Sequence, residues 1–256
     1  NSGGTFTPAS NIVTFAGASQ SISKSSAETF YGLVLQGSAT KTAGCDIVVT
    51  DDFALNGTAT LDMSGSNYNL TIGGNWTVTS TSSDPFKEQN GTVTFNGSAL
   101  QTITTALAAG ETFYDLSVTN NITGVVLADA IEVSNDFSIS NSGLFDAGGF
   151  AMDMKGDWTS NGTFTPNSNT VTFSGTGEQI ITNTSGETFY NFTSNCTGPI
   201  SLEAATDITV TNTLDMTAGL FNLNSRTFTL GSSGVASTLT RTGSTTTNWV
   251  YDGTFK

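Results

Sequence analysis

The sequence predicts an all-β protein that folds as a right-handed parallel β-helix, a β-solenoid in which short strands stack turn upon turn. Three observations lead to this prediction. The chain repeats itself three times at a spacing of about 80 residues. Within each repeat, short segments of alternating apolar and hydroxyl residues recur about every 20 residues. The composition favours strands and turns, since Thr, Val, Phe, Gly and Asn are abundant and helical spacing of apolar residues is scarce.

The repeat is clearest in the sequence Glu-Thr-Phe-Tyr, which occurs at 28–31, 111–114 and 187–190. A Val-Thr-Phe sequence accompanies it at 13–15, 93–95 and 171–173. We therefore expect one solenoid domain, 1–256, made of three repeats and a C-terminal coil, at approximately 1–80, 81–160, 161–240 and 241–256.

Each repeat carries four apolar segment types in a fixed order. The first two are the Val-Thr-Phe and Glu-Thr-Phe-Tyr segments. The third type lies at 47–49, 131–133 and 208–210, and the fourth at 69–72, 151–154 and 227–230. With one coil per segment, and Trp249-Val250-Tyr251 as a thirteenth, the sequence predicts about 12–13 coils of roughly 20 residues.

In each segment two apolar residues are expected to point inward and the Thr between them outward. The repeat core is then formed by Phe15, Phe95, Phe173, Phe30, Phe113 and Phe189. We expect equivalent Phe residues to share one angular position, four coils apart. Trp76 and Trp158 occupy equivalent places and are interpreted as packing residues at a coil corner.

A string of immunoglobulin-like β-sandwiches is the alternative fold, because such domains have a similar length. A sandwich, however, alternates strands of unlike role and gives no recurrence every 20 residues or so. The internal recurrence therefore favours the solenoid.

Composition and charge exclude several classes of function. The net charge is −14, and only 7 residues are Lys or Arg. Such a chain repels phosphate backbones, so we expect no nucleic-acid partner. No apolar run approaches the length of a membrane span, so we expect no membrane insertion. Low charge with abundant Ser, Thr, Asn and Gly favours an extracellular or cell-surface location.

The sequence offers no convincing catalytic site. There is no His, which removes the usual triads and most zinc sites. The acidic residues Asp51, Asp52, Asp153 and Asp157 are candidates for a glycosidase pair, yet turn positions explain them more simply. We expect a protein that is not an enzyme and has no cofactor. Asp51 and Asp52 mark where a weak surface calcium ion would bind.

The two cysteines are predicted not to bond to each other. Cys45 precedes the third segment and Cys196 follows the tenth, so seven coils separate them by roughly 30 Å. A disulfide needs Cα atoms within about 7 Å. They are expected to be free thiols or cross-links between chains.

The residue pattern resembles a known class of protein. The sequence Gly-Thr-Phe-Thr-Pro-Asn-Ser-Asn-Thr-Val-Thr-Phe at 162–173, with Gly-Gly-Asn-Trp-Thr at 73–77 and Gly-Leu-Phe-Asp at 143–146, is similar to the unit of long tandem-repeat proteins on bacterial surfaces. The resemblance covers nearly the whole chain. It implies an extracellular, non-enzymatic role as an adhesin or fibrous cell-envelope component, and it brings no catalytic residues.

Both ends of the chain look like interior coils. The N-terminal Gly-Thr-Phe-Thr-Pro at 4–8 copies residues 162–166, and Gly-Thr-Phe at 253–255 begins the same sequence again. We therefore expect a structural subunit or stalk of an extracellular filament, sheath or adhesin. Its partner would be itself, head to tail, or neighbouring repeats of a longer chain. The alternative is a cell-surface β-helix that binds or cleaves carbohydrate.

Overall fold

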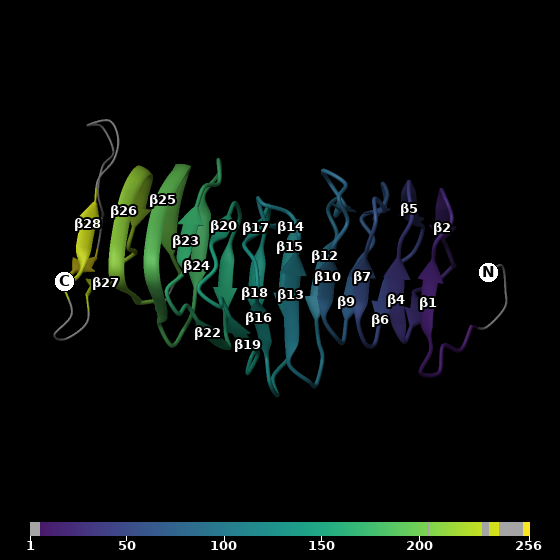
Figure 1. The fold of residues 1–256 in the computed structure, drawn as a ribbon. Helices are drawn as coiled ribbons and strands as arrows, with labels where there is room; N and C mark the ends of the chain where they lie inside the picture. The colour runs from purple at the N-terminus through teal and green to yellow at the C-terminus, as the bar shows by residue number, and fades with distance from the viewer. Residues whose placement is uncertain (1–5, 204, 232–235, 241–252) are drawn as a thin grey trace.

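The computed structural model describes residues 6–203, 205–231, 236–240 and 253–256, and every regular element in them is a β-strand. The strands pair in parallel from turn to turn and build a β-solenoid of about 11 turns, with about 21 residues per turn. At about 4.8 Å per turn, this makes a rod roughly 50 Å long. Figure 1 shows the strands side by side along one axis, with the chain termini at opposite ends. The parallel β-helix is confirmed, and the β-sandwich alternative is wrong.

Each turn contributes three strands, one to each of three faces. The first face is an eight-stranded parallel sheet of β1 (Ile12–Phe15), β4 (Gly32–Leu35), β7 (Phe53–Leu55), β10 (Trp76–Val78), β13 (Gln101–Thr105), β16 (Val125–Leu127), β19 (Leu144–Asp146) and β22 (Thr163–Thr165).

The second face contains β2 (Gln20–Ile22), β5 (Thr40–Ala43), β8 (Thr60–Asp62) and β11 (Phe86–Lys87), and then β14 (Glu111–Phe113), β17 (Ile131–Val133), β20 (Met152–Met154) and β23 (Thr170–Phe173). The third face contains β3 (Glu28–Phe30), β6 (Ile47–Val49), β9 (Leu70–Ile72), β12 (Thr92–Phe95), β15 (Asp115–Val118), β18 (Phe137–Ile139), β21 (Trp158–Ser160) and β24 (Gln179–Thr182).

The last turns contain two long strands, β25 (Glu187–Leu202) and β26 (Ile208–Asn222), which continue around the corners and pair with each other along most of their length, with three shifts of register. Along its length β25 pairs first with β23 and then with β24. Beyond β26 lie β27 (Thr227–Leu230), β28 (Thr238–Thr240) and β29 (Thr254–Phe255).

The core is a stack of inward side chains, because alternate residues of each short strand point to opposite sides. On the first face Leu33, Phe53, Trp76 and Ile103 are in register from turn to turn, and all are fully buried. The residues between them face outward. This alternation is the pattern that the sequence predicted for each segment.

Corresponding strands of successive repeats lie on different faces. The Val-Thr-Phe segments form β1 on the first face, β12 on the third and β23 on the second. A repeat thus advances by eleven strands, one fewer than the twelve of four full turns at three strands per turn.

The expectation that Phe15, Phe95 and Phe173 share one angular position is therefore wrong, because they lie on three different faces. The expected period of roughly 20 residues per coil is confirmed, and β3, β6, β9 and β12 do lie one turn apart. The number of turns is about 11, not 12–13, because two successive segments can fall in the same turn. β1 and β3, for example, belong to the same turn. The second-face strands between them, such as β2, are too polar to be recognised as apolar segments. The thirteenth segment, Trp249-Val250-Tyr251, lies outside the described residues.

Turns are held together at the corners as well as by the strands. Between the first and second faces, the backbone N–H of Thr58 donates to the Gly37 carbonyl oxygen at 2.9 Å. Gly37 and Gly57 have φ values of +84° and +71°, in the left-handed region that favours glycine. Before the third face, the carboxylates of Asp115 and Asp136 each accept the backbone N–H of the equivalent residue one turn later, both at 3.0 Å. Within the described ranges, no helix is long and apolar enough to cross a membrane.

Candidate functional site

The acidic residues considered for carbohydrate chemistry are engaged in bonds between neighbouring turns. The Asp52 carboxylate accepts hydrogen bonds from the backbone and side-chain nitrogens of Asn75, at 2.8 and 3.0 Å. Asp153 accepts the Ser174 hydroxyl at 2.6 Å, and Asp157 accepts a backbone N–H of the next turn at 2.8 Å. These bonds give the three carboxylates a role in stacking the turns.

The remaining candidate, Asp51, hydrogen-bonds to the Tyr31 hydroxyl, and this bond is the main reason that the pKa of Tyr31 is raised. Across the described part of the chain, no group of three or more Cys, Asp or Glu residues is arranged to hold a metal ion. The place expected for calcium, at Asp51 and Asp52, therefore shows no cluster of ligands.

Both cysteines are free and buried. The Cys45 thiol lies 3.9 Å from the Ile22 carbonyl oxygen, and the Cys196 thiol lies 3.6 Å from the Ser194 hydroxyl. Burial raises the pKa of both thiols, which lowers their reactivity. A cross-link between chains would first require each thiol to become accessible.

The most distinctive cluster in the core combines a tryptophan with a buried glutamate. The Trp76 ring packs edge-on against Phe86 and Phe113, with centroids 4.9 and 5.2 Å away. Its indole Nε1–H donates to Glu111 Oε2 at 3.2 Å, and Glu111 is only 1% exposed. We call this arrangement of one Trp, two Phe and one Glu the indole–carboxylate cluster.

The next repeat builds the same cluster from equivalent residues. The Trp158 ring packs against Phe164 and Phe189 with centroids 4.9 and 5.3 Å away. Its Nε1–H donates to Glu187 Oε2 at 2.9 Å. The two copies thus reproduce each other within a few tenths of an ångström, although they lie on different faces.

The buried carboxyl groups have strongly perturbed acidity. Burial raises the pKa of Glu111 to about 7, and the hydrogen bond from Trp76 offsets only part of this change. Burial also raises the pKa of Glu187, against hydrogen bonds from Trp158 and the Thr188 backbone. A raised carboxyl pKa in a pocket is one mark of a catalytic acid. Here it recurs in two equivalent core positions, which indicates a structural role.

The first repeat contains the same cluster without the indole. Phe6 and Phe30 lie 5.9 Å apart, close to the 6.3 Å between Phe86 and Phe113. Glu28, at the position of Glu111, is 5% exposed.

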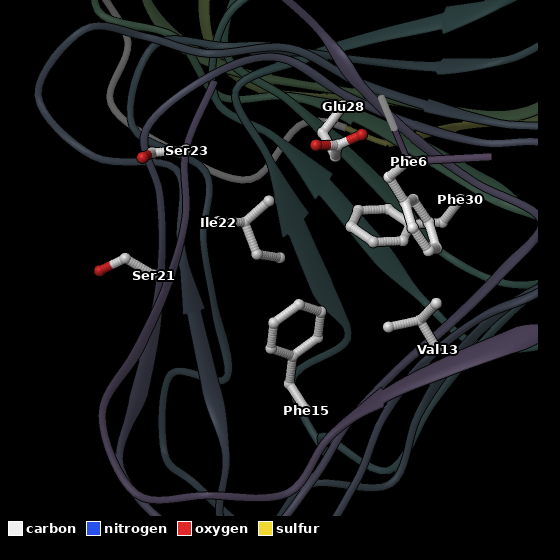
Figure 2. A pocket seen from close by; sticks show the side chains of 8 residues that line it. All are labelled: Phe6, Val13, Phe15, Ser21, Ile22, Ser23, Glu28 and Phe30. Carbon is white, nitrogen blue, oxygen red and sulfur yellow. The ribbon is translucent and has the colours of Figure 1, made fainter. Parts of the chain in front are cut away.

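In place of an indole there is a cavity of about 290 Å³ at the N-terminal end of the rod, which Figure 2 shows. Its lining consists of Phe6, Val13, Phe15, Ser21, Ile22, Ser23, Glu28 and Phe30. The carboxylate of Glu28 and the rings of Phe6 and Phe30 lie on the same side of this cavity (Figure 2).

A glutamine side chain that links two successive turns in the later repeats also lacks some of its partners at this end. In the second repeat, Gln101 Oε1 accepts the Gly97 N–H at 2.8 Å. Its Nε2 donates to two carbonyl oxygens of the preceding turn, at 2.9 and 2.7 Å. Gln179 makes the same three bonds in the third repeat. Gln20 keeps the first bond, from the Gly17 N–H at 2.8 Å, but the described residues place no turn before it.

The six Phe residues expected in the core lie as follows. Phe30, Phe95, Phe113, Phe173 and Phe189 are buried, and Phe15 is partly buried beside the end cavity. In each repeat the first-segment and second-segment Phe form an edge-to-face pair with centroids 6.1, 6.5 or 6.2 Å apart.

Sequence reasoning missed the buried charged groups. Glu28, Glu111 and Glu187 were noted as repeat markers, and their inward orientation follows from their alternation with the buried Phe. Lys41 was not noted at all. It is fully buried, and its Nζ donates to three carbonyl oxygens of two successive turns at 2.8 to 3.0 Å. The sequence did contain one sign of this role: Lys41 is a rare cation within a segment of small and hydroxyl residues.

Comparisons with protein-family models, with curated proteins and with solved structures find no significant match to this chain. The candidate site therefore rests on the geometry of the chain itself. It is the N-terminal end of the solenoid: the unpaired side of β1, β2 and β3 together with the cavity beside Glu28.

Proposed function

We propose that this chain is a structural element of an extracellular filament, sheath or adhesin stalk, and that it assembles by end-to-end stacking of solenoid turns. The observation that carries the proposal is the N-terminal turn. Its Gln20 and Glu28 are interior side chains whose equivalents, in both later repeats, bond to a turn that precedes them. A further turn placed on this end would supply those partners.

The backbone of the first turn supports the same proposal. β1 pairs with β4, and within the described residues it has no second neighbour. The Gln36 N–H donates to the Phe15 carbonyl oxygen at 2.9 Å, so the backbone groups of Phe15 point toward the second turn. In a parallel strand the neighbouring residue points the other way, so the groups of Thr14 face the open end. Such an unpaired edge is a template for another strand.

Apolar side chains are also exposed at both ends of the rod. Phe6 and Ile12 are 38% and 63% exposed at the N-terminal end, and Leu239 and Phe255 are 48% and 42% exposed at the C-terminal end. Contact between the two ends would remove this surface from water, which is favourable. A contact between unlike ends is heterologous and open-ended, so it generates filaments.

Composition supports an extracellular location. Charged residues make up 11% of the chain, and the net charge of −14 opposes non-specific association along the sides of the rod. A carbohydrate-cleaving β-helix is less well supported, because Asp52, Asp153 and Asp157 are bound to neighbouring turns.

The substitution Thr14→Pro tests the proposal at the open edge. Proline removes the N–H of Thr14, which pairs with no strand among the described residues of the same molecule, and the φ of proline suits an edge strand. We expect wild type to associate with rising concentration in sedimentation velocity and to form rods in electron micrographs. Thr14→Pro should weaken this association about tenfold, because a donor in the contact is lost.

Thr14→Val is the matched control, since it keeps the N–H and alters only the outward side chain. It should associate like wild type. A wild-type protein that stays monomeric at the highest soluble concentration would overturn the proposal. Circular dichroism of each variant verifies that the fold is retained.

A further inference from the structure

The buried glutamates of the three repeats differ in the residue that lies four positions before each of them. Before Glu28 this residue is Lys24, whose Nζ donates to Glu28 Oε1 at 3.3 Å. Before Glu187 it is Asn183, whose Nδ2 donates to Glu187 Oε2, also at 3.3 Å. In the first and third repeats, therefore, a side-chain nitrogen of the preceding loop bonds to the buried carboxylate.

The second repeat has no nitrogen at this position. The residue four before Glu111 is Leu107, whose side chain has no hydrogen-bond donor. The loop is also longer, since Gln101 lies ten residues before Glu111, whereas Gln179 lies eight residues before Glu187. The second repeat therefore combines a missing donor with a longer loop.

A cavity of about 240 Å³ lies beside Glu111, between this longer loop and the preceding turn. Glu111 and Phe86 are buried parts of its wall, and Asp84, Ala108 and Ala109 are exposed around it. The two turns are not joined by strand pairing here, because β11 pairs with β8 and β14 pairs with β17, and no pairing links β11 to β14 among the described strands. The cavity is smaller than the roughly 300–1,000 Å³ usual for drug-sized ligands, so it suits a group of a few atoms.

The carboxylate of Glu111 has capacity for a further donor. Its Oε2 accepts the Trp76 indole N–H at 3.2 Å, and its Oε1 accepts the Thr112 backbone N–H at 3.3 Å. The two oxygens of a carboxylate offer about four acceptor sites, so these bonds leave room for a third. Glu187 accepts such a third bond, from Asn183, in addition to its indole and backbone donors.

The charged and apolar groups around the cavity favour a cation with an alkyl stem. Glu111 and Asp84 both line the cavity, and its described lining residues include no Lys or Arg. Burial raises the pKa of Glu111 to about 7, and the charges of Glu88 and Asp84 add to this rise. A cation close to Glu111 would favour its ionised form. Phe86 and Leu107 present apolar surface to the same cavity, against which an alkyl stem can pack.

We propose that this cavity binds a primary alkylammonium group, whose nitrogen donates to Glu111 and whose alkyl stem packs against Phe86 and Leu107. A free amine and a lysine side chain of another protein both carry this group. Lys24, which bonds to the equivalent Glu28, provides a model of the contact within the chain itself. The proposal is independent of end-to-end assembly, because the cavity lies between interior turns of the rod.

The indole N–H of Trp76 reports on the cavity directly, because it donates to Glu111. The test is a titration of ¹⁵N-labelled protein with n-butylammonium chloride at constant ionic strength and about pH 8, where Glu111 is mostly ionised and the amine is protonated. We expect the Trp76 indole cross-peak to shift with a dissociation constant on the order of 1 mM. The Trp158 cross-peak should stay in place, because Asn183 occupies the equivalent position. Trp76→Phe and Trp158→Phe variants identify the two cross-peaks.

Two further probes define the group that is recognised. The neutral 1-butanol has the same stem without the charge and should produce no comparable shift. The compound N-acetyl-lysine N-methylamide carries the ammonium group on a lysine within a peptide. Binding of this probe indicates a lysine side chain as the natural source, and binding of butylammonium alone indicates a free amine.

Substitutions provide a second arm of the test. Glu111→Gln removes the negative charge and should weaken butylammonium binding about tenfold. Glu187→Gln makes the same change in the cluster whose donor is internal, and it should leave binding unchanged. Leu107→Lys places an ammonium group at the position of Lys24 and should abolish binding. Leu100→Lys adds the same charge at an exposed position outside the cavity and should bind nearly as wild type does.

The proposal is overturned if neither amine moves the Trp76 cross-peak, if the Trp158 cross-peak moves equally, or if 1-butanol binds as well as butylammonium. It is also overturned if Leu107→Lys binds butylammonium like wild type. Leu107 lies in a loop, so this variant keeps the test decisive even where Glu111→Gln does not fold. Circular dichroism of each variant verifies the fold.

Discussion

At the scale of single residues, the core depends on buried polar groups that each serve two turns. Glu111 accepts the Trp76 indole, and Gln101 joins the carbonyl oxygens of one turn to an N–H of the next. A buried polar group of this kind stabilises the fold only when its partners are present, and it is costly otherwise. These residues therefore specify the order in which the turns stack, because their hydrogen bonds need particular partners. The apolar side chains of the core pack against many kinds of neighbour and specify this order less.

Stability is expected to fall as pH rises from about 4.5 to about 7, because of Glu111. Its pKa is raised from 4.5 to about 7 in the folded state. Below the unfolded pKa both states are protonated and the full stability is present. As pH rises toward 7, only the unfolded state ionises, so the free energy of unfolding decreases, by a total on the order of 3 kcal/mol.

The measurement is urea denaturation between about pH 4 and pH 9, monitored by tryptophan fluorescence. Glu111→Gln should flatten this part of the profile, because the amide does not titrate. A profile for Glu111→Gln that still parallels wild type would show that Glu111 is not the titrating group.

At the scale of elements, the short strands depend on tight corners. Gly57 lies in the corner between β7 and β8, where a Cβ atom would approach the Gly37 carbonyl oxygen to 2.9 Å. Its positive φ adds strain for any other residue.

We therefore expect Gly57→Ala to destabilise the protein by about 1–3 kcal/mol. The change would appear as a lower urea midpoint with an unchanged slope. Gly65 offers a matched control, because a Cβ there meets no atom within 4 Å and its φ is not in the left-handed region. Gly65→Ala should leave the midpoint near that of wild type, and equal effects of the two substitutions would contradict the corner argument.

Elements also show what sequence could and could not predict. The alternation of inward and outward residues in segments such as Ile47–Val49 correctly predicted the strands, their inward side chains and the solenoid. This was possible because the alternation depends on local backbone geometry alone. The second-face strands were missed, because Gln20–Ile22 and Thr40–Ala43 have the polar composition of turns. The angular positions of the repeats were wrong because strand number per turn depends on these missed strands. The cavity beside Glu28 could not be predicted from the sequence, because its existence depends on how side chains from successive turns pack together.

At the scale of the whole molecule, each turn makes its contacts with its two neighbours, so length should be adjustable in whole turns. Deleting residues 119–139, from the end of β15 to the end of β18, removes one complete turn and joins two points on the third face. We expect a folded rod that is shorter by about 5 Å in small-angle X-ray scattering, with a cooperative thermal transition.

Deleting residues 119–129 instead removes β16 alone and is the matched comparison. Every later strand then moves to a different face, which puts the wrong side chains in register. This variant should lose its cooperative transition. If both deletions fold equally well, stability does not depend on the match between turn and face.

The advance of eleven strands per repeat has a mechanical consequence. If a repeat filled four whole turns, its weakest strand would recur along one side, and the rod would bend easily in that direction. Because each repeat instead lags by one strand, any difference in stiffness between its strands moves to a different face in each repeat, as the Val-Thr-Phe strands β1, β12 and β23 do on the first, third and second faces. We therefore expect such differences to be averaged around the axis over three repeats, so that the rod resists bending nearly equally in all directions.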